Sequence, residues 1–78
     1  VVFMLSKEQF GQRLYETRKK NQETHADLAA VLGCVKRKLS EMESGKKITT
    51  AEKIVLICEH YHICSDYLLG LTDDPNPR

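Results

Sequence analysis

Three consecutive cations, Lys36, Arg37 and Lys38, are the residues of this chain whose types and spacing most directly suggest chemistry. They stand at the start of a short amphipathic run that ends in a glycine. Because a helix N-terminus carries a partial positive charge, it disfavours cations. A negatively charged partner such as a phosphate would compensate for this repulsion. The alternative is a solvated surface helix, in which Arg37 and Glu41 form a pair worth about a few tenths of a kcal/mol.

A second group of candidate side chains consists of Cys58, His60, His62 and Cys64, which together suggest a zinc site. On a helix, however, Cys58 and His60 would point in nearly opposite directions, so they could not share one ion. We therefore predict that Cys58 is a small apolar core residue and that the chain binds no metal. The sequence also contains no nucleophile with an adjacent base and no glycine-rich phosphate loop, so we expect no catalytic residue and no cofactor.

The composition fits one small globular domain, because the chain has 78 residues and 41% of them are hydrophobic. The net charge is only +1, but its distribution is uneven. Residues 36–47 hold five Lys or Arg against two acids, whereas residues 52–74 hold five acids and one Lys. Three cysteines without paired spacing favour a reducing cytoplasm. The apolar start, residues 1–5, is too short for a signal peptide or a membrane span, so we expect no membrane association.

Helical periodicity and capping signals predict an all-α fold with five helices and no strands. The first helix is expected to begin at Lys7, after a Ser6 capping box, and to end near Asn21. The second follows a cap at Thr24 and ends at Gly33. The third ends at Gly45 and is expected to bury Val35, Leu39 and Met42. A cap at Thr49 begins the fourth, whose expected inward residues are Ala51, Ile54, Ile57, Cys58 and Tyr61. The fifth is short and covers residues 65–69.

The connection between the second and third predicted helices is only about three residues long and contains a glycine. Such a connection is typical of a helix-turn-helix, although an ordinary corner between two helices remains the alternative. On a helical wheel the face opposite the buried residues of the third helix consists of Arg37, Ser40, Glu41 and Ser44, with Lys36 and Lys38 on its flanks. Long or small polar residues of this kind are what a helix needs to enter the DNA major groove.

The chain resembles the Cro and lambda-repressor-like helix-turn-helix family, also called the XRE family, over about residues 8–71. The resemblance rests on FGQRLYETRKK, THADLAAVLG, LSEMESGKK and YHICSDYLLGL, in that order and spacing. It implies a compact five-helix domain, which we place at residues 6–71, between the apolar segment 1–5 and a polar tail or linker, 72–78. We expect that tail to be too polar and proline-rich to pack.

The resemblance also implies roles for individual residues. Base reading would come from Lys36, Arg37, Ser40 and Glu41. Phosphate contacts would come from Thr24, His25, Lys38, Lys46, Lys47 and Thr49. Arg18 would pair with Glu43, which the wheel places at the edge of the buried face, where an unpaired carboxylate is unfavourable.

Three residues depart from the pattern of the family. His25 stands where a glutamine is usual, so a phosphate contact there would depend on pH. Val35 stands where a capping serine or threonine is usual, which removes a cap worth about 1 kcal/mol. Glu23 stands where an apolar residue is preferred.

The function that these observations predict is a cytoplasmic, sequence-specific DNA-binding transcriptional regulator of prokaryotic or phage type, with repression as its expected action. Its partner would be double-stranded DNA with a palindromic operator, bound by a homodimer. The interface would be weak when free and would include Leu56, Leu71 and the apolar segment 1–5. Two alternatives stay open: an antitoxin-like protein that binds a toxin and its own operator, and a protein-interaction module that kept the fold. A C-terminal effector domain is a further expected partner.

Overall fold

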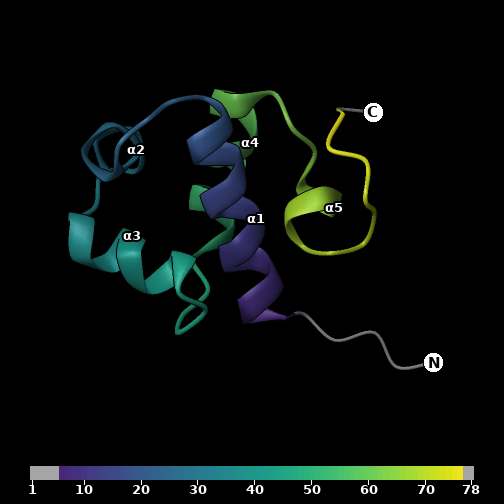
Figure 1. The fold of residues 1–78 in the computed structure, drawn as a ribbon, viewed down its shortest axis with the longest axis horizontal. Coiled ribbons are helices and arrows are strands. Elements are labelled where there is room, and N and C mark those ends of the chain that lie inside the picture. The colour runs from purple at the N-terminus through teal and green to yellow at the C-terminus, as the bar shows by residue number, and fades with distance from the viewer. Residues whose placement is uncertain (1–5, 77–78) are drawn as a thin grey trace.

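The structure, a computed structural model, describes residues 6–76 and is all-helical, as predicted. Its helices are α1 (Lys7–Lys20), α2 (His25–Leu32), α3 (Lys36–Glu43), α4 (Ala51–Tyr61) and α5 (Ser65–Leu68). Figure 1 shows α1 in the middle, with α2 and α3 on one side and α5 on the other. The apolar segment 1–5 lies outside the described residues. None of the helices between residues 6 and 76 has the length and apolarity that a bilayer crossing needs.

The capping residues largely match the sequence signals. The Ser6 side chain accepts from the Gln9 N–H, and Thr24 and Asp27 form a reciprocal capping box. The fourth cap was predicted one residue too early, because Thr50, not Thr49, accepts from the Lys53 N–H and begins α4. Adjacent threonines offer the same cap chemistry, so only the packing of the helix selects between them.

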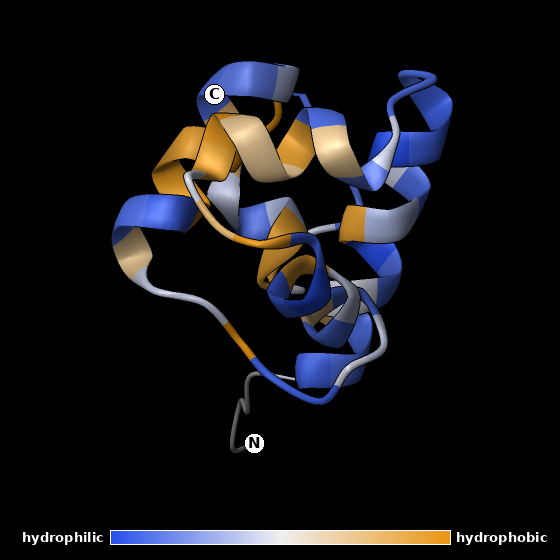
Figure 2. Cartoon of the chain, turned by 90° about the vertical axis from the view of Figure 1, so that its left-hand side faces the viewer, coloured by the Kyte–Doolittle hydropathy of each residue, from blue (hydrophilic) through white to orange (hydrophobic). Residues whose placement is uncertain are grey.

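The core lies where the helices meet, and Figure 2 shows hydrophobic and hydrophilic stretches alternating along them, as amphipathic helices require. Its buried members are Phe10, Leu14, Leu28, Ala29, Leu32, Leu39, Met42, Ile57, Tyr61 and Leu68. Two predicted core residues are exposed, Val35 at 62% and Ala51, and two others, Ile54 and Cys58, are half-buried and pack against the core. Val35 has extended backbone angles (φ −81°, ψ 153°) as the N-cap of α3, so the helical wheel does not describe its direction.

Helices α1 and α3 cross with their backbones in close contact at Gly11. A Cβ atom at this position would overlap the Met42 carbonyl oxygen and would lie 2.7 Å from that of Glu43. Only a glycine therefore permits this approach of the last turn of α3 to α1.

A buried ion pair joins the same two helices. The Arg18 guanidinium donates from Nε to Glu43 Oε2 at 2.7 Å and from Nη2 to Oε1 at 3.1 Å. Its Nη1 donates to the Glu23 carbonyl oxygen at 2.7 Å. The two side chains are only 5% and 6% exposed, and the hydrogen bond to Glu43 raises the pKa of Arg18 above its ordinary value. The implied Arg18–Glu43 pair is therefore present and satisfied.

The Glu23 side chain fastens the α1–α2 loop to α4. The Tyr61 hydroxyl donates to Glu23 Oε1 at 2.6 Å, and His60 Nε2 lies 2.9 Å from Oε2. Burial and this hydrogen bond raise the pKa of Tyr61, so the phenol stays protonated and remains a donor. Polar contacts thus take the place of the apolar residue that is usual in the family at Glu23.

The prediction that the C-terminal tail does not pack is wrong for residues 72–76. Arg13 of α1 donates to the carbonyl oxygens of Tyr67 and Thr72, and its Nη2 lies 2.7 Å from Asp73 Oδ1. The Cys64 N–H donates to the Pro75 carbonyl oxygen at 3.0 Å. The tail carries few apolar groups, but its backbone carbonyl groups still accept hydrogen bonds. The composition of the tail does not show that Arg13 and the Cys64 N–H are the donors.

The contact at Gly11 predicts an unusual response to substitution. An alanine normally stabilises a helix by about 1 kcal/mol relative to glycine. Gly11→Ala should instead lower the free energy of unfolding by about 1–3 kcal/mol, because the added methyl group overlaps the α3 backbone. Urea denaturation measures this, with the exposed neighbour Gln12→Ala as the control. A stabilising Gly11→Ala would contradict the close approach.

The buried ion pair predicts non-additive energetics. Arg18→Ala and Glu43→Ala should each lower the free energy of unfolding by about 3–5 kcal/mol, because each strands a buried charge. The double variant should cost clearly less than the sum, since neither charge is then left without its partner. A double-mutant cycle in urea gives the coupling energy. Additive losses would show that the two residues act independently.

Candidate nucleic-acid interface

Helices α2 and α3 form the two arms of a helix-turn-helix. The turn consists of residues 33–35, the length that the sequence predicts. Gly33 has left-handed backbone angles (φ 67°, ψ 32°), and the Cys34 N–H donates to the Ala29 carbonyl oxygen at 3.1 Å. Leu28 and Leu32 of α2 and Leu39 of α3 belong to the same core. This packing directs the opposite face of α3 away from the body of the domain.

The outward face of α3 carries unneutralised positive charge at its N-terminal end. Its exposed members are Lys36, Arg37, Lys38 and Ser40. The first turn has no acidic residue, and Val35 supplies no side-chain cap, as predicted. Among residues 6–76 none of the three cations has a carboxylate oxygen within 4.0 Å, so the proposed surface pair of Arg37 with Glu41 does not form.

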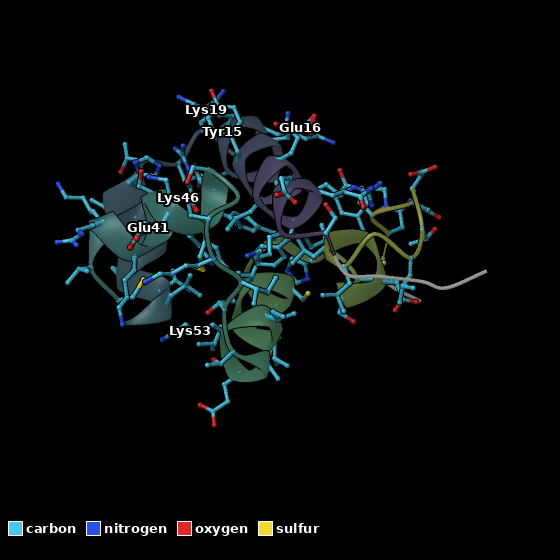
Figure 3. The ribbon with its side chains drawn as sticks, turned by 90° about the horizontal axis from the view of Figure 1, so that it is seen from below. Tyr15, Glu16, Lys19, Glu41, Lys46 and Lys53 are labelled. Atoms are coloured by element: carbon cyan, nitrogen blue, oxygen red, sulfur yellow. The ribbon has the colours of Figure 1, made fainter. Side chains whose placement is uncertain are left out.

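Glu41 is half-buried and lies nearer to the loop after α3 than to Arg37. Its Oε2 is 3.9 Å from Lys47 Nζ, and its carbonyl oxygen accepts from the Lys46 N–H at 3.0 Å. Figure 3 shows Glu41 and Lys46 in the same part of the molecule, at the end of α3. The loop lysines thus lie beside the predicted reading residues of the helix.

His25 does not simply point at solvent. Its Nε2 lies 3.0 Å from Glu43 Oε1, and its side chain is 38% exposed. To donate to that carboxylate, Nε2 must carry the hydrogen, so Nδ1 of the neutral ring is an acceptor. A phosphate oxygen is also an acceptor, and His25 therefore gains a donor for it at Nδ1 only when the ring is protonated.

The remaining predicted phosphate-binding residues occupy the edges of this surface. Thr24 is exposed, and its Oγ1 accepts from the Asp27 N–H, which leaves the hydroxyl hydrogen free to donate. Its own N–H donates to the Asp27 carboxylate and lowers the pKa of that group. Lys38, Lys47 and Thr49 line one hollow between α3 and α4. The structure therefore brings these three together, whereas Lys36 and Ser40 stand on the exposed face of α3.

The cysteine and histidine group of α4 does not converge. His60 faces Glu23, and His62 has left-handed backbone angles as the C-cap of the helix. Cys58 is half-buried, and burial raises the pKa of its thiol. In the described part of the chain no three His, Cys, Asp or Glu side chains could hold a metal ion together.

Several residues that position the helices were not identified from the sequence. Gly11 and Arg13 fix α1 against α3 and the tail, and Lys53 Nζ donates to the Leu32 carbonyl oxygen at the end of α2 at 2.9 Å. Each of these contacts joins residues more than twenty positions apart. Periodicity and capping signals are local, so they do not predict such contacts.

The chain is similar to known helix-turn-helix proteins. The family described as "Helix-turn-helix domain" matches residues 9–70. A curated relative, the uncharacterized HTH-type transcriptional regulator YobD of Bacillus subtilis (strain 168), is 37% identical over 69 residues. That match covers 88% of this chain but spans only 62% of the length of the relative.

A solved structure shares the fold. The restriction-modification controller protein C.AhdI from Aeromonas hydrophila superposes with a TM-score of 0.71, over 80% of this chain and 94% of that chain. The sequence identity of this pair is 24%, so the likeness concerns the fold alone. Together with the family match over residues 9–70, the two-helix unit and its turn identify the chain. It belongs to the helix-turn-helix domain family, as its resemblance to the Cro and lambda-repressor-like proteins predicted.

Proposed function

We propose that the protein is a sequence-specific DNA-binding transcriptional regulator that reads the major groove with α3. The observation that carries this proposal is the exposed N-terminal end of α3, where Lys36, Arg37 and Lys38 have neither an acidic neighbour in the first turn nor a side-chain cap. DNA phosphates would supply the missing negative charge. The names of the two relatives, a transcriptional regulator and a controller protein, support the same class.

The proposed contacts divide into two kinds. Lys36, Arg37 and Ser40 would reach base edges, because they are exposed on the face of α3 that points away from the core. Glu41, half-buried beside Lys47, would reach base edges from the border of that face. Around them, Thr24, His25, Lys38, Lys46, Lys47 and Thr49 would meet phosphates. Phosphate contacts supply most of the affinity and base contacts the sequence preference.

Two copies of the domain are expected on one palindromic operator, because one helix reads too few base pairs for high specificity. Val55 and Leu56 of α4 and Leu71 after α5 are apolar and 53%, 41% and 53% exposed, and we assign the self-interaction to these residues. A small exposed apolar surface suits a weak dimer that becomes complete on DNA. The same surface is where a toxin partner or an effector domain would dock in the alternative function.

We propose repression as the action of the protein, because occupation of an operator excludes other proteins from it. DNA as the partner implies that the protein acts in the cytoplasm.

The two kinds of contact predict different effects of substitution. A preferred site is first selected from randomised duplex DNA. Arg37→Ala should then weaken binding to that site by about 5- to 150-fold, since a bidentate contact to guanine provides about 1–3 kcal/mol of discrimination. Binding to random DNA should weaken far less. Lys46→Ala should weaken both about equally and should lower the slope of log affinity against log salt by about one.

Glu41 supplies a contrasting substitution within α3. Its carboxylate lies near the proposed phosphates and close to Lys47, so Glu41→Ala should tighten binding to random DNA while it changes the base preference. Fluorescence anisotropy measures the affinity of all three variants for the selected and the random duplexes. Equal effects of the three substitutions on both duplexes would refute base reading by α3.

Pairing on DNA predicts a cooperative response. The free protein should sediment as a monomer or a weak dimer, and two copies should bind a palindrome cooperatively. Leu56→Glu should abolish this cooperativity and leave the affinity for a single half-site unchanged, because the substitution places a charge in the apolar surface. Gln12→Glu, on exposed α1, is the control. A tight dimer at nanomolar concentration without DNA would contradict this assembly.

A further inference from the structure

A hollow lies between α3 and α4, next to the turn of the helix-turn-helix. Its volume is about 340 Å³, near the lower end of the roughly 300–1,000 Å³ that small-molecule sites occupy. Its apolar lining comes from Cys34, Met42 and Ile48, which belong to the core or pack against it. Three lysines line it as well, from α3, the following loop and α4: Lys38, Lys47 and Lys53.

The charge around this hollow is largely uncompensated. Lys53 Nζ donates one hydrogen to the Leu32 carbonyl oxygen at 2.9 Å, which holds the side chain in place and leaves two N–H donors. Figure 3 shows Lys53 extending from α4 towards the side of the molecule on which α3 lies. Lys47 has only the distant partner Glu41, at 3.9 Å, and Lys38 has no carboxylate within 4.0 Å in residues 6–76.

A second hollow of about 410 Å³ continues the first towards the turn. The two share Cys34, Lys38 and Lys53, and the second adds Gly33 and Val35. The exposed Val35 side chain, which the core does not use, therefore extends the apolar lining. Together they form one groove, with apolar residues along its walls and amines among them.

We propose that this groove binds a small organic carboxylate with an apolar body, such as a medium-chain aliphatic acid. The carboxylate would accept hydrogen bonds from the lysine amines, and the aliphatic body would cover Cys34, Met42 and Ile48. A DNA phosphodiester offers the charge but no apolar group of that kind, so DNA alone leaves this lining uncovered.

The site also has a regulatory consequence, which rests on the proposed function. Lys38 and Lys47 line the groove and are also two of the proposed phosphate ligands. A bound carboxylate neutralises them at the edge of the DNA-binding surface, so it lowers the affinity for DNA. The acid is therefore an effector that releases the protein from its operator.

The first experiment tests the site without DNA. Octanoate is titrated into the ¹⁵N-labelled protein, and amide shifts are followed by NMR below the micelle concentration. Saturable shifts are expected at Cys34, Met42, Ile48 and Lys53. Octan-1-ol should bind more weakly because it lacks the charge, and acetate should not saturate because it lacks the apolar body. Absence of saturable shifts with octanoate, or equal binding of acetate, overturns the site.

Matched variants test the lysines. Lys38→Gln with Lys47→Gln should weaken octanoate binding by at least about tenfold, the loss expected when two charge-assisted hydrogen bonds disappear. The control is Lys36→Gln with Lys46→Gln, which removes the same charge outside the groove; Lys46 lies well apart from Lys53 in Figure 3. All four side chains are exposed, so both variants should fold. Equal losses in the two double variants would show general charge attraction and overturn the proposal.

The cysteines provide a second readout. Octanoate should slow alkylation of Cys34 by iodoacetamide and leave Cys58 and Cys64, which lie outside both hollows, unaffected. Equal protection of all three would overturn the assigned location.

The regulatory step is tested separately. Octanoate should weaken binding of the unmodified protein to its selected duplex, with half-effect at the concentration that half-saturates the NMR shifts. Unchanged DNA affinity with octanoate bound would refute the effector role. If the protein binds no DNA even without octanoate, the proposed function fails, and the NMR titration still decides the site.

Discussion

The structure depends on the buried pair of Arg18 and Glu43, which sets α3 against α1. Two opposite charges that are almost excluded from water are stable only if each finds its full set of partners. Here the Glu43 carboxylate accepts hydrogen bonds from Arg18 and His25, and Nη1 of Arg18 donates to the Glu23 carbonyl oxygen. The ion pair therefore fixes three segments: Arg18 contacts the end of α3 and the α1–α2 loop, and Glu43 contacts His25 at the start of α2. Gly11 allows this arrangement because it has no side chain that would hold the backbones of α1 and α3 apart.

Two of the three departures from the family pattern, Glu23 and His25, are compensated by this same network. Glu23 replaces an apolar contact with hydrogen bonds from Tyr61 and an interaction with His60, so the loop still attaches to α4. His25 replaces a glutamine and gives Glu43 a further donor. Glu23 and His25 both place a polar group at a half-buried position, and both groups have a partner there. The helix-turn-helix geometry is retained because the polar groups are satisfied, although the original contacts are absent.

The positive charges at the start of α3 destabilise the helix itself. Lys36, Arg37 and Lys38 repel the positive end of the helix dipole, and Val35 gives no cap. A surface helix without a ligand gains nothing from this arrangement, whereas one that meets phosphates recovers the loss on binding. The groove beside the turn adds Lys53 to the same positive region and joins it to apolar side chains.

Much of the fold followed from local signals in the sequence. Capping residues such as Ser6 and Thr24, the left-handed Gly33 and the helical spacing of Leu39 and Met42 determined the helices and the short turn, because these signals act within four residues. The outward face of α3 followed from the same spacing.

Contacts between distant residues were decided by the tertiary structure. The packing of the tail on Arg13 and the position of His25 on Glu43 depend on partners far along the chain. The choice of Thr50 over Thr49 as a cap also did not follow from the sequence, because both threonines offer the same cap chemistry. Only the Arg18–Glu43 pair was anticipated, from the family resemblance and from the burial of a carboxylate. A sequence contains the chemistry of each group, but hydrogen bonds and burial depend on distances that exist only once the helices have packed.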